Sequence, residues 1–447
     1  MSKIIQLSDH FDIRRLLRYT FPSIIMLVFT SIYGVVDGFF VSNFVGKTPF
    51  AAVNFIMPFL MILGGAGFMF GTGGSALIAK TLGEGKLQQA NRLFSLIVYI
   101  SAACALLLTA LGLLVLRPVA SLLGARGQML EGCVLYGQII LAALPFFILQ
   151  NEFQCFFATA GKPKLGLAIT MAAGIINMVL DALFIAFFRW GIAGAAAATA
   201  LSQLVGGIIP LFYFFRDNPS SLRLTRCTFN GRALLKTCTN GSSELMSNLS
   251  MSLISMLYNA QLMRYAGEDG IAAYGVLMYV SFIFQAIFIG YSVGSSPVIG
   301  YHYGADNRGE LKNLLQKSLL LIGIFSGLMF LSGQTLARPL SLLFTGYDQA
   351  LLAMTHRAFR LYSISFLFSG FAIFGSAFFT ALGDGLTSAF LSFMRTLFFQ
   401  CLAVLLFPLI WGLDGIWFAT AAADGLSVLI VALLLFVLRK KYHYAEA

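Results

Sequence analysis

The sequence predicts an all-α integral membrane protein in which twelve transmembrane helices form two pseudo-symmetric six-helix lobes. Three observations support this fold class. First, 59% of the 447 residues are hydrophobic and only 11% are charged, whereas a soluble domain carries about 25% charged residues. Second, the second half of the chain repeats the first at a nearly constant offset. Third, Lys and Arg collect in alternate connections between the apolar runs, as they do in membrane proteins.

The internal repeat is visible in three pairs of short motifs. They are Arg117-Pro118 and Arg338-Pro339, Trp190-Gly191 and Trp411-Gly412, and residues 156–161 and 378–383. The first two pairs lie 221 residues apart and the third lies 222 residues apart. Matches that hold to one residue across both halves indicate two copies of one structural unit.

Each copy contains six apolar runs that are long enough to cross a membrane as a helix, which takes about 20 residues. The predicted spans of the first copy are residues 19–41, 51–79, 93–116, 133–159, 165–188 and 192–215. Those of the second copy are residues 238–262, 271–299, 314–336, 355–381, 386–410 and 414–438. We therefore divide the chain into an N-terminal lobe (1–218), a cytoplasmic linker (219–237) and a C-terminal lobe (238–447).

The distribution of basic residues predicts that both termini are cytoplasmic. With the N-terminus inside, 20 Lys and Arg residues lie in connections on the cytoplasmic side and 8 on the other side, and cationic loops favour the cytoplasm. We expect no cleavable signal peptide, because the charged start of the chain leads directly into a full-length span. Since each copy has an even number of spans, both copies enter from the same face and enclose a space between them.

Composition also argues against several other classes of protein. The net charge of +11 does not indicate nucleic-acid binding, because the basic residues lie in short loops between spans. Six cysteines without CxxC spacing argue against a disulfide framework or a zinc site. None of the four histidines lies in the middle of a span, so an intramembrane enzyme is disfavoured. We expect a protein that is not an enzyme and needs no cofactor or structural metal.

Charged residues inside the predicted spans are the main candidate functional residues. A charge at the centre of a bilayer costs about 2.5–3.5 kcal/mol on insertion scales, so such residues are expected to face protein or water. From the charged residues of the spans we select the acids Asp37, Glu152, Asp181 and Glu244 and the base Arg395. An acidic interior favours cations. For Arg395 we expect a structural role, either pairing with one of the acids or capping carbonyl groups.

Two further patterns extend this candidate set. Asn177 and Asp181 are four residues apart and share a helix face, where an amide oxygen and a carboxylate provide part of a site for a hard cation or a proton relay. We predict ion coupling at Asp37, Asn177, Asp181 and Glu244, with Na⁺ as a possible ligand of these residues. Hydrogen bonding between helices is the alternative role for each.

The predicted substrate cavity is lined by polar residues of two spans. On the seventh span Glu244 begins a stripe in steps of three or four residues, and such a stripe faces protein or water rather than lipid. The stripe continues through Asn248, Ser252, Ser255 and Asn259. A cluster on the fourth span comprises Gln150, Asn151, Glu152 and Gln154. Some members of this cluster are expected to bond to neighbouring helices instead.

Several motifs along the chain resemble the multidrug and toxic compound extrusion (MATE) family. They are residues 33–41 around Asp37, residues 71–74, residues 160–163, residues 297–307 and residues 412–417. The resemblance covers essentially the whole chain. It implies two six-helix lobes arranged in a V and a coupling role for an acid at the position of Asp37. It also implies a multi-pass protein of the bacterial cytoplasmic (inner) membrane.

The function that this resemblance implies is secondary antiport. Cationic or amphipathic drugs and toxic compounds would leave the cell by alternating access, in exchange for H⁺ or Na⁺, through a monomer embedded in membrane lipid. Family members that use Na⁺ carry a glutamate on the seventh span and an aspartate on the tenth, but residues 361–381 contain no acid. A lipid-linked oligosaccharide flippase of the same superfamily is the alternative; it would need cationic residues to hold a diphosphate.

Overall fold

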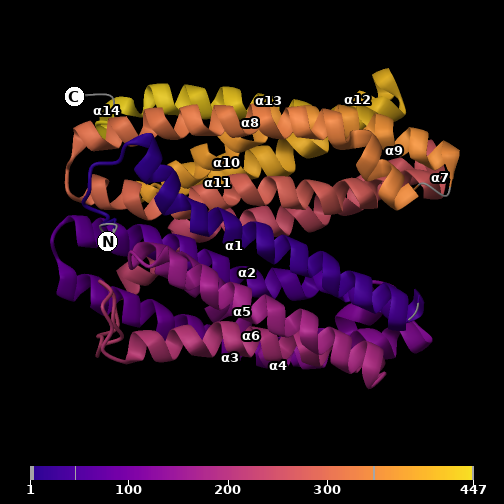
Figure 1. Cartoon of the computed structure of the whole chain (residues 1–447), viewed down its shortest axis with the longest axis horizontal. Coiled ribbons are helices and arrows are strands. Elements are labelled where there is room, and N and C mark those ends of the chain that lie inside the picture. Colours follow the sequence, from indigo (N-terminus) through magenta and orange to yellow (C-terminus); the bar gives the residue numbers. More distant parts are fainter. Residues whose placement is uncertain (1–4, 46, 346–347, 445–447) are drawn as a thin grey trace.

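Helices form all the regular structure in the computed structural model, which describes residues 5–45, 47–345 and 348–444. The helices lie side by side in two bundles, one built from the first half of the chain and one from the second (Figure 1). This arrangement confirms the predicted all-α fold. The outer limits of the predicted lobes, residues 1 and 447, lie outside the described residues.

The N-terminal bundle contains six long helices. These are α1 (Ile13–Phe40), α2 (Lys47–Gly83), α3 (Leu87–Leu122), α4 (Gly127–Thr159), α5 (Pro163–Asp181) and α6 (Gly191–Phe215). Two π-helical segments continue α1 and α5, η1 (Val41–Val45) and η2 (Ala182–Phe187). Each predicted span of this half coincides with one helix, or with a helix and its π-helical continuation, because the apolar runs are long and bounded by Gly or charged residues.

The C-terminal bundle divides its crossings among a larger number of helical segments, which differ widely in length. Its helices are α7 (Gly231–Gly304), α8 (Arg308–Thr345), α9 (Gln349–Tyr362), α10 (Phe366–Ala381), α11 (Gly385–Phe393), α12 (Phe399–Trp411), α13 (Leu413–Val437) and α14 (Arg439–Tyr442). The 3₁₀ segment η3 (Ser363–Ser365) joins α9 to α10, and the π segment η4 (Met394–Phe398) joins α11 to α12. Each joined pair therefore makes one crossing.

The long helix α7 accounts for two predicted spans. Its backbone leaves the helical conformation at Gly267, where φ is 63° and ψ is −147°, a conformation that glycine adopts without steric cost. Eleven helical segments of the described residues are long and apolar enough to cross a membrane. The part of α7 before Gly267, predicted as the seventh span (238–262), is not among them. It has the length of a span, but its polar stripe lowers its hydropathy.

The connection between the lobes is shorter than predicted. It runs from Arg216, after α6, to Asn230, whose side chain caps α7 by accepting a hydrogen bond from the Ala233 backbone N–H (3.1 Å). Residues 231–237 of the predicted linker are therefore helical. The connection lies along α3, where the Arg223 backbone N–H donates to Asn91 Oδ1 (2.9 Å).

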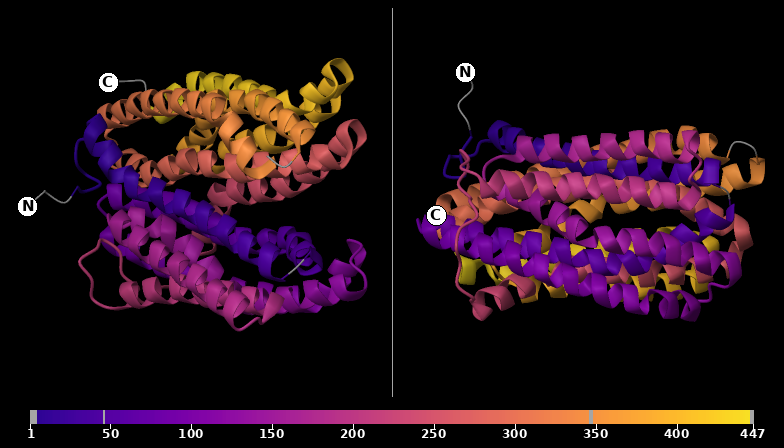
Figure 2. Two further views of the ribbon diagram at one scale, coloured as in Figure 1. Left: turned by 45° about the vertical axis from the view of Figure 1, so that its right-hand side comes forward. Right: turned by 90° about the horizontal axis from the view of Figure 1, so that it is seen from below.

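The lobes meet through α1, α2 and α7. We call the end of the molecule that holds the start of α1 and α14 the near end, and the end that holds α9 the far end (Figure 1). At the near end a Cβ atom on Gly83 of α2 would lie 1.9 Å from the Tyr301 carbonyl oxygen of α7. Figure 2 shows the two bundles diverging toward the far end, which gives the molecule its V shape.

Candidate functional site

Two acids of the N-terminal bundle lie together near the far ends of their helices. Asp37 comes from the last turn of α1, and Asp181 is the last residue of α5. Their carboxyl groups interact electrostatically and lie within hydrogen-bonding reach of each other. Asp181 is fully buried. In the described part of the chain, Asp37 Oδ1 and both carboxyl oxygens of Asp181 have no hydrogen-bond partner of ordinary geometry.

Further oxygen atoms surround this acidic pair. Asn177 lies one turn before Asp181 and is 1% exposed, and its Oδ1 atom has no partner among the described residues. The hydroxyl of Tyr136 on α4 is also buried without a partner there, and it lies within electrostatic range of both acids. The structure thus brings three predicted coupling residues together and adds Tyr136, which the sequence pattern did not single out.

The local backbone explains how these side chains are placed. The π segment η2 begins directly after Asp181, and η1 begins four residues after Asp37. π-helical turns frequently occur at functional sites because the extra residue re-aims side chains. Carboxylate, amide and hydroxyl oxygens are ligands for a proton, a hard cation or ordered water.

The predicted cluster on α4 points in three directions inside the N-terminal bundle. Glu152 is fully buried, and its Oε2 atom accepts a hydrogen bond from Ser101 Oγ on α3 (2.6 Å). Gln150 packs against Gly206 of α6, and Asn151 packs against Gly67 of α2. Gln154 is 6% exposed. The four residues therefore do not share one face, and their contact with a substrate stays a prediction.

A second group of charges lies in the C-terminal bundle. Arg395, in η4, is within electrostatic range of Glu244 on α7 and of Asp424 on α13. Asp424 is only 3% exposed. The structure thus places Arg395 within electrostatic range of two acids, one of which the sequence analysis overlooked. The structural role of Arg395 stays a prediction.

The repeat could have revealed Asp424. At the offset of 221, Thr420 and Asp424 of α13 correspond to Thr199 and Gln203 of α6. Both copies thus carry a hydroxyl and a longer polar side chain one turn apart on the last span. The polar character of this position recurs in the two lobes although its charge does not.

The stripe on α7 is only partly available to a ligand. The Asn248 side chain donates a hydrogen bond to the Glu244 carbonyl oxygen (2.9 Å), so it is satisfied by its own helix. Ser252, Ser255 and Asn259 are half-buried. Glu244 interacts electrostatically with the Cys155 thiol of α4, as does Glu152, which places Glu244 at the boundary between the lobes. The role of the stripe in substrate binding stays a prediction.

Comparison with known proteins agrees with this architecture. A family model described as MatE matches residues 22–183 and 245–405. The multidrug export protein MepA of Staphylococcus aureus (strain MRSA252) is 23% identical over 435 residues, which cover 96% of this chain and 94% of that protein.

Two solved structures share the fold closely. One is the crystal structure of MATE in complex with MaL6, with a TM-score of 0.92 at 22% identity over 98% of this chain and 100% of that chain. The other is the outward-facing conformation of a multidrug resistance MATE family transporter of the MOP superfamily, with a TM-score of 0.92 at 22% identity over 99% of each chain. Since the family model spans both lobes and more than half of the residues, the chain belongs to the MatE family.

Proposed function

We propose that this protein is a secondary active antiporter of the bacterial cytoplasmic membrane. It exports cationic or amphipathic drugs and toxic compounds in exchange for H⁺ or Na⁺ by alternating access, with both termini in the cytoplasm. Its membership of the MatE family and its similarity to a multidrug export protein over nearly its whole length support the direction and the class of substrate.

The observation that carries the proposal is the pairing of Asp37 and Asp181. Two negative charges that close together in a poorly solvated site repel each other strongly. The pair is therefore most stable when a proton or a cation lies between the carboxyl groups, with Asn177 and Tyr136 providing further oxygen atoms. Binding or release of that ion changes how α1 packs against α5, since the two acids lie on these helices.

The ion gradient supplies enough free energy for this cycle. One charge that moves through 100 mV yields about 2.3 kcal/mol, and each pH unit adds about 1.4 kcal/mol. An outward-facing pump takes up the ion at the acidic pair and releases its substrate, and the inward-facing pump discharges the ion to the cytoplasm.

The C-terminal acids are less suited to hold the coupling ion. A cation at Glu244 or Asp424 would have to compete with Arg395, which already interacts with both. We therefore place coupling in the N-terminal lobe. The flippase alternative is not favoured, because the ionisable residues buried within the spans are mainly acidic and would repel a diphosphate.

Transport in proteoliposomes tests this function. We expect an imposed proton or sodium gradient to drive the movement of a fluorescent organic cation, and each gradient is applied alone to identify the coupling ion. Asp37→Asn and Asp181→Asn should each lower gradient-driven transport at least ten-fold. Asp217→Asn, which changes an exposed acid of the connection between the lobes, is the matched control. Parental transport by both pair variants would show that coupling resides elsewhere.

A further inference from the structure

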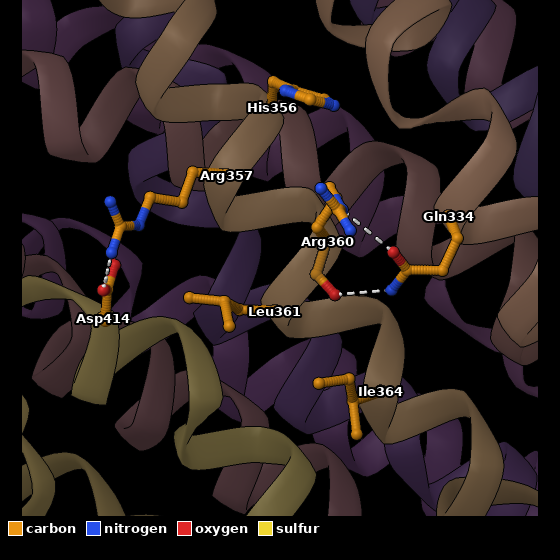
Figure 3. Close-up of a pocket in the computed structure, with 7 residues that line it drawn as sticks. All are labelled: Gln334, His356, Arg357, Arg360, Leu361, Ile364 and Asp414. Carbon is orange, nitrogen blue, oxygen red and sulfur yellow. Dashed lines mark hydrogen bonds and ion pairs between the residues drawn. The ribbon is translucent and has the colours of Figure 1, made fainter.

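A pocket lined in part by charged side chains, at the far end of the C-terminal bundle, has no role in the proposed pump cycle. It lies between α8, α9 and the start of α13 (Figure 3). Its volume is about 310 Å³. The residues that line it are Gln334, His356, Arg357, Arg360, Leu361, Ile364 and Asp414. Three of these are basic or can become so, and they come from one turn of α9.

The charge of Arg360 is not neutralised within the pocket. Its Nε atom donates to Gln334 Oε1 (3.1 Å), and Gln334 Nε2 donates back to the Arg360 carbonyl oxygen (2.8 Å). These bonds hold the guanidinium in place, and among the described residues no carboxylate forms an ion pair with it. The acid in the pocket, Asp414, is already paired with Arg357. Figure 3 shows the two pairs on opposite sides of the pocket.

The pocket lies at the level of the membrane surface. Asp414 follows Trp411, which is 55% exposed, and exposed tryptophans concentrate at the boundary between lipid and water. Trp190, the counterpart of Trp411 in the first copy, is also 55% exposed. The pocket itself adds the apolar side chains of Leu361 and Ile364 to its basic groups. A ligand that carries a negative group next to hydrocarbon matches this combination.

The duplicated fold does not require these charges. At the offset of 221, the positions of Arg357, Arg360 and Asp414 correspond to Tyr136, Ile139 and Ala193. The offset of 222 places them instead on Leu135, Gln138 and Ile192. Neither register puts a charged residue at these positions of the first copy. The basic pocket is therefore a property of the C-terminal lobe alone.

From this geometry we infer that the pocket binds the phosphate of an anionic phospholipid headgroup, with Arg360 as its principal ligand. Guanidinium groups bind phosphate through paired, charge-assisted hydrogen bonds, and the apolar side chains beside Arg360 suit the hydrocarbon part of a phospholipid. His356 and the part of the Arg357 guanidinium that is not paired with Asp414 line the same pocket and face the same headgroup. The acyl chains then leave the pocket over Leu361 and Ile364 toward the membrane.

Lipid binding to the purified full-length protein tests this inference. Native mass spectrometry of the protein with phosphatidylglycerol or phosphatidylcholine measures the affinity for each lipid. We expect the parent protein to prefer phosphatidylglycerol and Arg360→Gln to weaken its binding about five-fold, which corresponds to about 1 kcal/mol. Arg338→Gln is the matched control, since Arg338 is an exposed arginine on α8 that does not line the pocket.

Two further measurements separate the sources of the phosphate group. Inorganic phosphate at millimolar concentration should leave phosphatidylglycerol binding unchanged; if it displaces the lipid, the site belongs to free phosphate and the lipid assignment is wrong. Equal binding of the two lipids by the parent protein would overturn the inference. So would the same affinity for phosphatidylglycerol in Arg360→Gln and Arg338→Gln, with the unfolding temperature of both variants showing that they are folded.

Discussion

At the scale of single residues, Asp384 shows how one carboxylate ties two parts of the C-terminal bundle together. It caps α11 by accepting hydrogen bonds from the Thr387 backbone N–H (3.2 Å) and hydroxyl (2.8 Å). It also accepts a hydrogen bond from the Tyr442 hydroxyl of α14, and Lys441 Nζ lies 3.5 Å away. Burial raises the pKa of Asp384, but these hydrogen bonds and the Lys441 charge outweigh it and hold the pKa below its usual range.

This lowered pKa predicts a pH-dependent contribution to stability. A carboxyl group whose pKa is lower in the folded than in the unfolded state stabilises the fold above its unfolded pKa of about 4 and loses that effect as the pH falls. We expect Asp384→Asn to unfold at a lower temperature than the parent at pH 7. The difference should shrink below about pH 4. Thermal unfolding in detergent across this pH range measures it.

Tyr442→Phe provides the control for Asp384. It keeps the packing of the ring but removes the hydroxyl that donates to the carboxylate. The pKa of Asp384 should rise, so the pH at which stability is lost should move upward relative to the parent. A difference between parent and Asp384→Asn that is constant from pH 3 to pH 7 would contradict the assigned charge.

The site residues differ in how far the sequence could reveal them. Asp37 and Asp181 stand out because an acid in an apolar span needs an explanation. Their mutual contact could not be derived, because it depends on how α1 packs against α5. Tyr136 could not be singled out in this way, since a tyrosine in a membrane helix is common. Asp424 could have been, because it too is an acid inside an apolar span, but it was overlooked.

At the scale of elements, the segment before α1 links the two lobes. Phe11 is fully buried, and its ring packs edge-on against Tyr19 of α1 (5.9 Å between ring centroids) and His302 of α7 (6.4 Å). Its backbone N–H donates to Glu310 Oε1 of α8 (2.8 Å), and its carbonyl oxygen accepts from Lys317 Nζ (2.8 Å). The segment that leads into the N-terminal lobe is therefore held by the C-terminal lobe.

Hydrogen exchange tests this link. Glu310→Ala removes a charged acceptor, and a hydrogen bond to a charged group contributes about 1.5–3 kcal/mol. We expect the amide of Phe11 to exchange at least ten-fold faster in this variant. Glu84→Ala, which removes an acid paired with Lys86 beyond the end of α2, should leave that rate unchanged. Equal exchange in Glu310→Ala and the parent would mean that the segment is held by packing alone.

The helices could be predicted better than the details that interrupt them. Long apolar runs and a repeat kept in register were sufficient to place the crossings, because both follow from burial in lipid. The start of α7 at Gly231 was missed because Arg232 and Lys236 continue the basic stretch that begins at Arg216, and such a stretch resembles a loop. The π-helical segments η2 and η4 lie within continuous apolar runs. The hydropathy of residues 165–188 and 386–410 therefore predicted two uninterrupted helices and could not reveal these segments.

At the scale of the whole molecule, the close contact between the lobes at the near end defines the conformation. A Cβ atom on Gly83 would lie 1.9 Å from the Tyr301 carbonyl oxygen, and one on Gly304 would lie 2.0 Å from the Lys80 carbonyl oxygen. A glycine of each helix thus lies directly against the backbone of the other helix, so no side chain fits between α2 and α7 at these positions. If alternating access operates, these two helices separate when the near end opens.

This contact predicts that a single methyl group shifts the conformational equilibrium. Gly83→Ala and Gly304→Ala should each force α2 and α7 apart and favour a state that is open at the near end. Double electron–electron resonance between spin labels at Lys86→Cys and Asp306→Cys, in a background without native cysteines, reports the separation. We expect a longer mean distance in both alanine variants.

Gly327→Ala, at a position on α8 with no neighbour within 4 Å of the added Cβ, should reproduce the parental distance. Unchanged distances in all three variants would show that the lobes do not separate along this contact, and the opening of the near end would then need a different hinge.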